Sequence, residues 1–274
     1  MATLRPACPA EQPWTGSACA APGDGEAALE RAATALAEFR VDDALKELDR
    51  ARAAGPYRHE ILVRLYEQLG IAYAYQKDEA RAMQAFDTLL SLDPGHLLPY
   101  TLSPQVTFLF ERARKDPKRE RPPAVDLSWP RHVDVSHPVP IDIEVLRDPT
   151  SELTRASIEV RKKGEPTYRA VDLELARPGA YRRVELPAVG AKHAEVLELH
   201  LRAYDAKGNE VLRWASAETP REIPLGYRPP VKWYRKWWVW ALAGSAVAAG
   251  TGITVYLFSI GPPDTLSGTV GINR

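Results

Sequence analysis

An uncharged run of residues lies near the C-terminal end of the chain, from Trp237 to Ile260. A helix of this length could cross a hydrocarbon core about 30 Å thick. Gly and Ala fill the middle of the run, and membrane helices tolerate both because they permit close packing. Gly-Pro-Pro at 261–263 would end the helix. Residues 237–260 are therefore predicted to form a single transmembrane helix, followed by a short tail at 261–274.

Aromatic and basic side chains crowd the start of this run and the juxtamembrane segment before it, residues 227–236. Trp rings and Lys or Arg side chains favour the interface between membrane and water. The residues predicted to anchor the chain are Lys232, Trp233, Arg235, Lys236, Trp237, Trp238 and Trp240. The lipid bilayer is thus one predicted partner, and a membrane localisation through a single C-terminal anchor is expected.

The chain has two cysteines, Cys8 and Cys19, in a flexible N-terminus predicted for residues 1–24. A disulfide between them would suit an oxidising compartment, and two unpaired thiols are the alternative. The disulfide favours a periplasmic body for the protein. The basic residues before the predicted membrane helix favour a cytoplasmic body by the positive-inside rule. The periplasmic side is the expectation, and the cytoplasmic side is kept as the alternative.

Residues 25–115 are rich in Ala and Leu, and their apolar residues recur at helical spacing. The strongest pattern, LYEQLGIAYAYQKDEARAMQAFDTLLSLDP, covers residues 65–94 and predicts two packed helices. Its predicted packing residues are Tyr66, Leu69, Gly70, Tyr73, Ala82, Phe86, Leu89 and Pro94. A weaker unit precedes it at 28–56, and a closing helix is predicted at 103–115.

The 65–94 pattern resembles the tetratricopeptide repeat, in which small residues let two antiparallel helices pack closely and bulky residues fill the seam. The resemblance implies a stack of α-hairpins that binds a protein partner in its concave groove. A plain helical spacer is the alternative.

A charged, Pro-rich linker at 116–123 leads to a segment in which apolar residues alternate with polar ones. Short strands and turn signals at this spacing predict a β-sandwich at 124–226. The last hairpin, LHLRAYDAKGNEVLRW, resembles the final strands of fibronectin type III or immunoglobulin-like modules. The predicted fold class is a multidomain chain, α then β: a tetratricopeptide-like stack, this sandwich and the transmembrane helix. The whole layout resembles uncharacterised envelope proteins of Gram-negative bacteria.

The charge is balanced, with 36 basic and 36 acidic residues, which argues against a nucleic-acid partner. The sequence contains no phosphate-binding loop, zinc-protease motif or nucleophile elbow. No catalytic residue, cofactor or metal site is predicted, and the protein is not expected to be an enzyme. The predicted function is a membrane-anchored adaptor that binds protein partners through its helices at the bacterial cell envelope. The alternative is a β-sandwich that binds glycan or peptidoglycan, with the helices as a spacer.

Overall fold

A computed structural model describes residues 4–8, 12, 14, 18–19, 23–175 and 177–229. Residues 1–227 belong to one compact unit, and residues 228–274 belong to a second. The described helices are α1 (Asp24–Ala37), α2 (Val41–Ala54), α3 (His59–Tyr75), α4 (Glu79–Leu92) and α5 (Pro104–Arg114). The described strands are β1 (Arg5–Pro6), β2 (Ala124–Ser128), β3 (Val133–Asp134), β4 (Val139–Arg147), β5 (Arg155–Lys162), β6 (Arg169–Glu174), β7 (Tyr181–Leu186), β8 (Glu195–Tyr204), β9 (Glu210–Trp214) and β10 (Arg221–Gly226).

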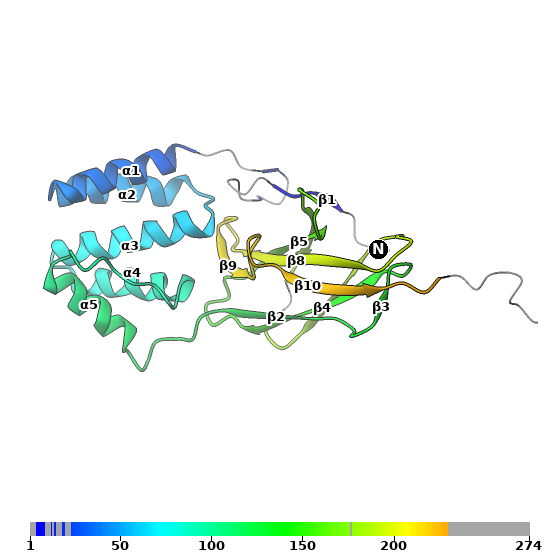
Figure 1. Cartoon of the computed structure of the whole chain (residues 1–274). Helices are drawn as coiled ribbons and strands as arrows, with labels where there is room; N and C mark the ends of the chain where they lie inside the picture. The colour runs from blue at the N-terminus through cyan, green and yellow to red at the C-terminus, as the bar shows by residue number, and fades with distance from the viewer. Residues whose placement is uncertain are drawn as a thin grey trace, which may run out of the picture. The chain divides into compact units, whose positions relative to one another are not determined.

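The helices pack as two hairpins, α1 with α2 and α3 with α4, and α5 packs against α3 and α4 (Figure 1). Local sequence sets two of the helix starts. The side chain of Asp78 accepts a hydrogen bond from the backbone N–H of Arg81 and caps α4. Ser103 caps α5, and Pro104 occupies the first turn, where a missing N–H costs nothing.

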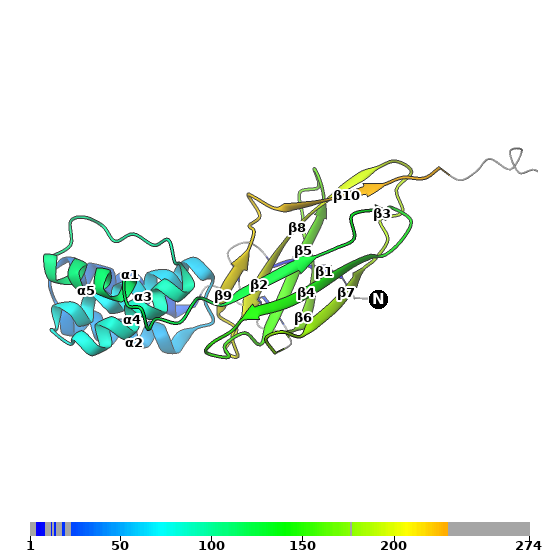
Figure 2. The same ribbon diagram turned by 90° about the horizontal axis from the view of Figure 1, so that it is seen from below.

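The strands form two sheets that lie as two layers (Figures 1 and 2). The larger sheet has the order β1-β6-β5-β8-β10-β3, and β9 also pairs with β8. The smaller sheet has the order β2-β4-β7. The larger sheet is mixed, because β3 runs parallel to β10 while the other described pairs are antiparallel.

Apolar side chains from both sheets and from the helices form one continuous buried cluster. Helix α3 contacts strand β9, so helices and strands meet inside the first compact unit. The predicted linker at 116–123 runs within this same unit.

The predicted fold class is corrected on three points. The helices do not form a clear tetratricopeptide stack, because units of a solenoid contact only their neighbours, whereas α3 also packs against a strand. The β half differs from the predicted sandwich, because its larger sheet is mixed and recruits β1 from the N-terminal segment. Alternation of apolar residues reveals strands but not which distant strand will pair with them.

The third correction concerns the membrane anchor. Among the residues that the structure describes, none of the helices is both long enough and apolar enough to span a bilayer. The predicted span at 237–260 and its anchoring residues from Lys232 to Trp240 lie outside the described residues. This finding argues against the transmembrane helix in the predicted fold class and against the predicted single-pass localisation.

Candidate functional site

The predicted packing residues of the helical half lie around the contact between α3 and α4. Six of them are buried: Leu69, Gly70, Tyr73, Ala82, Phe86 and Leu89. Tyr66 is half-buried, and Pro94 is exposed in the loop after α4. A Cβ atom at Gly70 would collide with the ring of Phe86, so the two helices approach closely because this residue has no side chain.

Three large apolar side chains of the helical half are exposed close together in sequence. Leu97 is 74% exposed, Tyr100 98% and Phe108 65%. We call these three residues the α5 patch. Exposed apolar groups are informative when they gather, because a soluble surface seldom leaves a large apolar patch uncovered without a binding role.

The loop between α4 and α5 runs back along α5. Near the end of α5, the guanidinium of Arg114 donates a hydrogen bond to the carbonyl oxygen of His96. The imidazole of His96 also lies edge-on to the ring of Phe110, with 6.4 Å between ring centroids. The loop then reaches Ser103 at the start of the helix. Leu97 and Tyr100 lie in this loop, and Phe108 lies on the helix that follows it.

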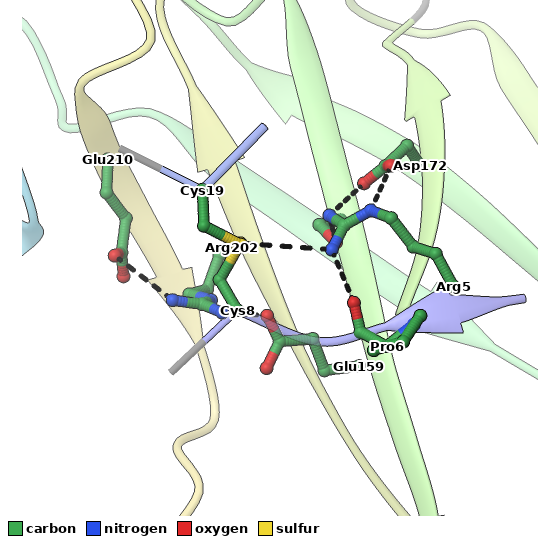
Figure 3. The surroundings of a disulfide bond; sticks show 9 residues. Arg5, Pro6, Cys8, Cys19, Glu159, Asp172, Arg202 and Glu210 are labelled. Atoms are coloured by element: carbon green, nitrogen blue, oxygen red, sulfur yellow. Dashed lines mark hydrogen bonds and ion pairs between the residues drawn. A yellow bond between two sulfur atoms is a disulfide. The ribbon is translucent and has the colours of Figure 1, made fainter. Parts of the chain in front are cut away.

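The second feature is a segment near the N-terminus that is tied to the larger sheet (Figure 3). A disulfide joins Cys8 and Cys19, whose Cα atoms lie 5.7 Å apart. Strand β1 pairs with β6, and Arg5 forms a two-pronged ion pair with Asp172, with N–O distances of 2.6 and 2.7 Å. Such a fork is geometrically specific, so it fixes the segment against the sheet.

The disulfide lies beside a row of charged side chains on β5 and β8. On one face of these strands, apolar residues point into the core. On the opposite face lie Ser157, Glu159, Arg161, Glu198, His200 and Arg202, which we call the polar face. Five of these six residues are buried, and Arg161 is partly buried. Buried charges are tolerated only when each is paired.

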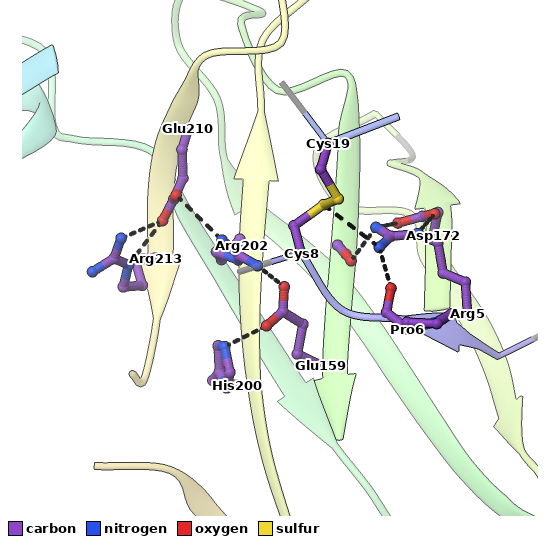
Figure 4. A network of polar contacts seen from close by, with 11 residues as sticks. Arg5, Pro6, Cys8, Cys19, Glu159, Asp172, His200, Arg202, Glu210 and Arg213 are labelled. Atoms are coloured by element: carbon purple, nitrogen blue, oxygen red, sulfur yellow. Dashed lines mark hydrogen bonds and ion pairs between the residues drawn. A yellow bond between two sulfur atoms is a disulfide. The ribbon is translucent and has the colours of Figure 1, made fainter. Parts of the chain in front are cut away.

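Strand register brings opposite charges of the polar face together (Figure 4). Glu159 lies directly across from His200, and its Oε2 is 3.1 Å from Nε2 of that imidazole. The other oxygen of Glu159 accepts a hydrogen bond from Arg202, its diagonal neighbour. Arg161 lies across from Glu198, at 2.6 Å. Glu159 is therefore the point where two strands and two donors meet.

The chain of charges continues through β9 to the helical half. Glu210 is fully buried and lies 3.9 Å from Arg202 and 2.7 Å from Arg213. Arg213 also pairs with Glu60 of α3, at 2.5 Å. Burial opposes ionisation of Glu60, but the hydrogen bond and positive charge of Arg213, a backbone hydrogen bond and the charge of Arg58 together outweigh it and lower the pKa of this carboxyl.

A backbone contact runs beside this ion pair. The amide of Tyr57 donates to Oδ1 of Asn209 at 3.0 Å, and the amide of Glu210 donates to the carbonyl of Tyr57 at 2.8 Å. Each of these bonds joins the residues just before α3 to the start of β9. The helices and the larger sheet are thus connected by both main-chain and charged contacts.

His200 is neutral at physiological pH. Burial lowers its pKa from an ordinary value of 6.5 to about 4, and the positive charge of Arg213 acts in the same direction. Because a carboxylate can only accept, the proton of the neutral ring sits on Nε2 and is donated to Glu159. Nδ1 then carries a lone pair, and it is buried without a hydrogen-bond partner among the described residues.

A groove with a volume of about 590 Å³ opens beside the polar face. It is lined by Glu159, His200 and Arg202 of the polar face, and also by Cys8, Glu60 and Arg213. Helix α3, strands β5, β8 and β9, and the disulfide-bonded segment therefore all contribute to one concave site.

The sequence patterns did not point to this site. In LELHLR, the alternation of Leu197, Leu199 and Leu201 with polar residues indicates a strand with one solvent-facing side. The structure buries that side beneath segments that are distant in sequence, including the one that holds Cys8. The sequence does contain one indication of this site. Charged residues of opposite sign stand at alternate positions of β5 and β8, so they can lie opposite one another when the two strands pair.

No protein-family model matches the chain, and no curated protein matches it in sequence. Within the described part of the chain, no group of three His, Cys, Asp or Glu side chains could hold a metal ion.

Proposed function

We propose that the protein is a non-catalytic binding protein whose helical half docks a protein partner at the α5 patch. The observation that carries this proposal is the exposure of Leu97, Tyr100 and Phe108 on and beside the last helix of the bundle. Other apolar residues of α5, including Val106 and Phe110, are buried against its neighbours. The helix thus has one face that is already covered and one that presents a large ring to solvent.

The chemistry of the patch favours a partner with an apolar surface. Aromatic side chains are enriched where protein interfaces have their strongest contacts, since they bury much area with little loss of conformational freedom. An amphipathic segment of another protein could pack its apolar side onto Tyr100 and Phe108.

The β half offers less support for an aromatic sugar-binding platform. Among the described residues of 124–229, Tyr181 is the exposed aromatic side chain, at 69%. One isolated ring does not form a platform, so the proposal is confined to the helical half.

Site-specific photo-crosslinking in cells that make the protein tests the proposal. A benzophenone amino acid replaces Phe108 in one sample and Tyr181 in the control, two aromatic positions of similar exposure. We expect one defined protein adduct from position 108 and none from position 181. A second probe at Tyr100 should capture the same protein, and Phe108→Ser should abolish that adduct. Equal labelling from positions 108 and 181, or no adduct from either helical position, would contradict the proposal.

A further inference from the structure

We propose that the groove beside His200 binds a small uncharged ligand that carries hydroxyl or amide groups. One such group would donate a hydrogen bond to Nδ1 of His200, and another would accept one from Nε of Arg202. This site is separate from the α5 patch, and the inference does not depend on the proposed protein partner.

The two protein atoms that define the ligand are buried and unpaired. His200 is 4% exposed and Arg202 is 5% exposed, and both line the groove. Nδ1 of His200 and Nε of Arg202 have no hydrogen-bond partner among the described residues. Leaving buried polar atoms unpaired is costly, so a ligand that pairs with them gains binding free energy.

The two atoms require ligand groups with opposite hydrogen-bonding roles. Nδ1 of His200 is an acceptor, because the ring proton is held on Nε2 by Glu159. Nε of Arg202 is a donor at all relevant pH values. The ligand therefore needs both a hydrogen-bond donor and a hydrogen-bond acceptor.

The charges around the groove argue against an ionic ligand. Arg202 is bound by Glu159, Arg213 by Glu60 and Glu210, and Arg161 by Glu198. Arg58 and Glu218, which are opposite in sign, also line the groove. An anion or a cation would have to displace a carboxylate or a guanidinium that is already paired.

The size of the groove sets an upper limit on the ligand. A volume of about 590 Å³ is within the range of small-molecule sites, and it suits a molecule of the size of a monosaccharide or disaccharide, or of a dipeptide. Saccharide hydroxyls and peptide-like amides share the required donor and acceptor chemistry, so the experiment has to separate these two sources.

The test is a titration of the full chain labelled with ¹⁵N at histidine, followed through the ring nitrogens by NMR. The first probe is N-acetylglucosamine, which carries both hydroxyls and an acetamide. Glucose provides the hydroxyl-only arm, and N-acetylglycinamide provides the amide-only arm. We expect a saturable shift of the Nδ1 resonance of His200 and no shift at the exposed His193. Saturation with glucose would identify a saccharide ligand, and saturation with N-acetylglycinamide would identify a peptide-like ligand.

A matched pair of variants tests the role of the imidazole. His200→Gln keeps a donor for Glu159 at the position of Nε2 but removes the Nδ1 acceptor. We expect it to weaken binding by about tenfold or more, and we expect His193→Gln to leave binding unchanged. Unchanged affinity in His200→Gln would overturn the proposal. Should that variant fail to fold, the wild-type titration decides alone: no saturable shift of His200 with any of the three probes would overturn it.

Discussion

The helical and β halves differ in how deeply their paired charged residues are buried. In the helical half, charged side chains lie on outer helix faces and pair in solvent, as Arg40 does with Asp43 one turn away. In the β half, Glu159 and Arg202 are paired with both partners almost fully buried. An exposed pair of the first kind is worth little, whereas breaking a buried pair is costly.

The difference arises from what covers each outer face. A helix buries one stripe of residues and leaves the rest in water. Strand β8 is covered on both faces, by the apolar core on one side and by charged neighbours and the disulfide-bonded segment on the other. The stability of the helical half should therefore depend on how closely its side chains pack between helices. The stability of the β half should depend on whether each buried charge keeps its partner.

The largest expected effect comes from breaking the buried pair. Glu159→Met should lower the free energy of unfolding by about 3–5 kcal/mol, because it leaves Arg202 buried with one partner fewer. The double variant Glu159→Met/Arg202→Met should recover about half of that loss or more. Glu30→Met, which breaks the exposed pair with Arg64 in the helical half, should cost less than about 1 kcal/mol. Chemical denaturation measures all three, and equal costs for Glu159→Met and Glu30→Met would remove the contrast between the two halves.

The next largest effect is a loss of stability in acid. The unfolded chain protonates His200 below pH 6.5, but the folded chain does so only near pH 4. The stabilisation by neutral His200 is therefore complete above pH 6.5 and is lost as the pH falls to about 4, by up to about 3 kcal/mol. His200→Gln should lose less stability than the wild type over this interval, whereas His193→Gln should follow the wild type. Parallel curves for the wild type and His200→Gln would refute this assignment.

The next prediction concerns the close packing of α3 against α4 in the helical half. Gly70→Leu should overpack the contact with Phe86 and lower the free energy of unfolding by about 1–3 kcal/mol. Ala82→Leu, at a fully buried position on the facing helix, should act in the same direction. Gly95→Leu, in an exposed loop, is the control. A melting temperature of Gly70→Leu equal to that of the wild type would exclude close packing at this seam.

The smallest expected effect is at the connection between the halves. Asn209→Ala removes the acceptor for the amide of Tyr57 and should lower the free energy of unfolding by about 1 kcal/mol. Hydrogen exchange of that amide should accelerate, while Lys207→Ala in the same turn should change neither quantity. An unchanged exchange rate in Asn209→Ala would show that this bond does not hold the two halves together.

Much of the helical half could be predicted from the sequence, because its information is local. The spacing of Leu69, Phe86 and Leu89 identifies the buried stripes, and Gly70 marks the close approach. Alternation likewise identified most strands of the β half. The mixed sheet and the polar face could not be predicted, since they depend on pairing across long sequence distances, such as Arg5 with Asp172. Pairing of that kind is set by tertiary packing and leaves little trace in periodicity.

The burial of the polar face is tested most directly by a pH titration of the ring resonances of His200, using NMR on the whole chain. A buried, neutral imidazole that donates to Glu159 should keep its Nε2–H form as the pH is lowered through 6.5, and it should protonate only near pH 4. Protonation of His200 near pH 6.5, as in an exposed histidine, would contradict the account, because β8 would then carry its charges in water as the helices do.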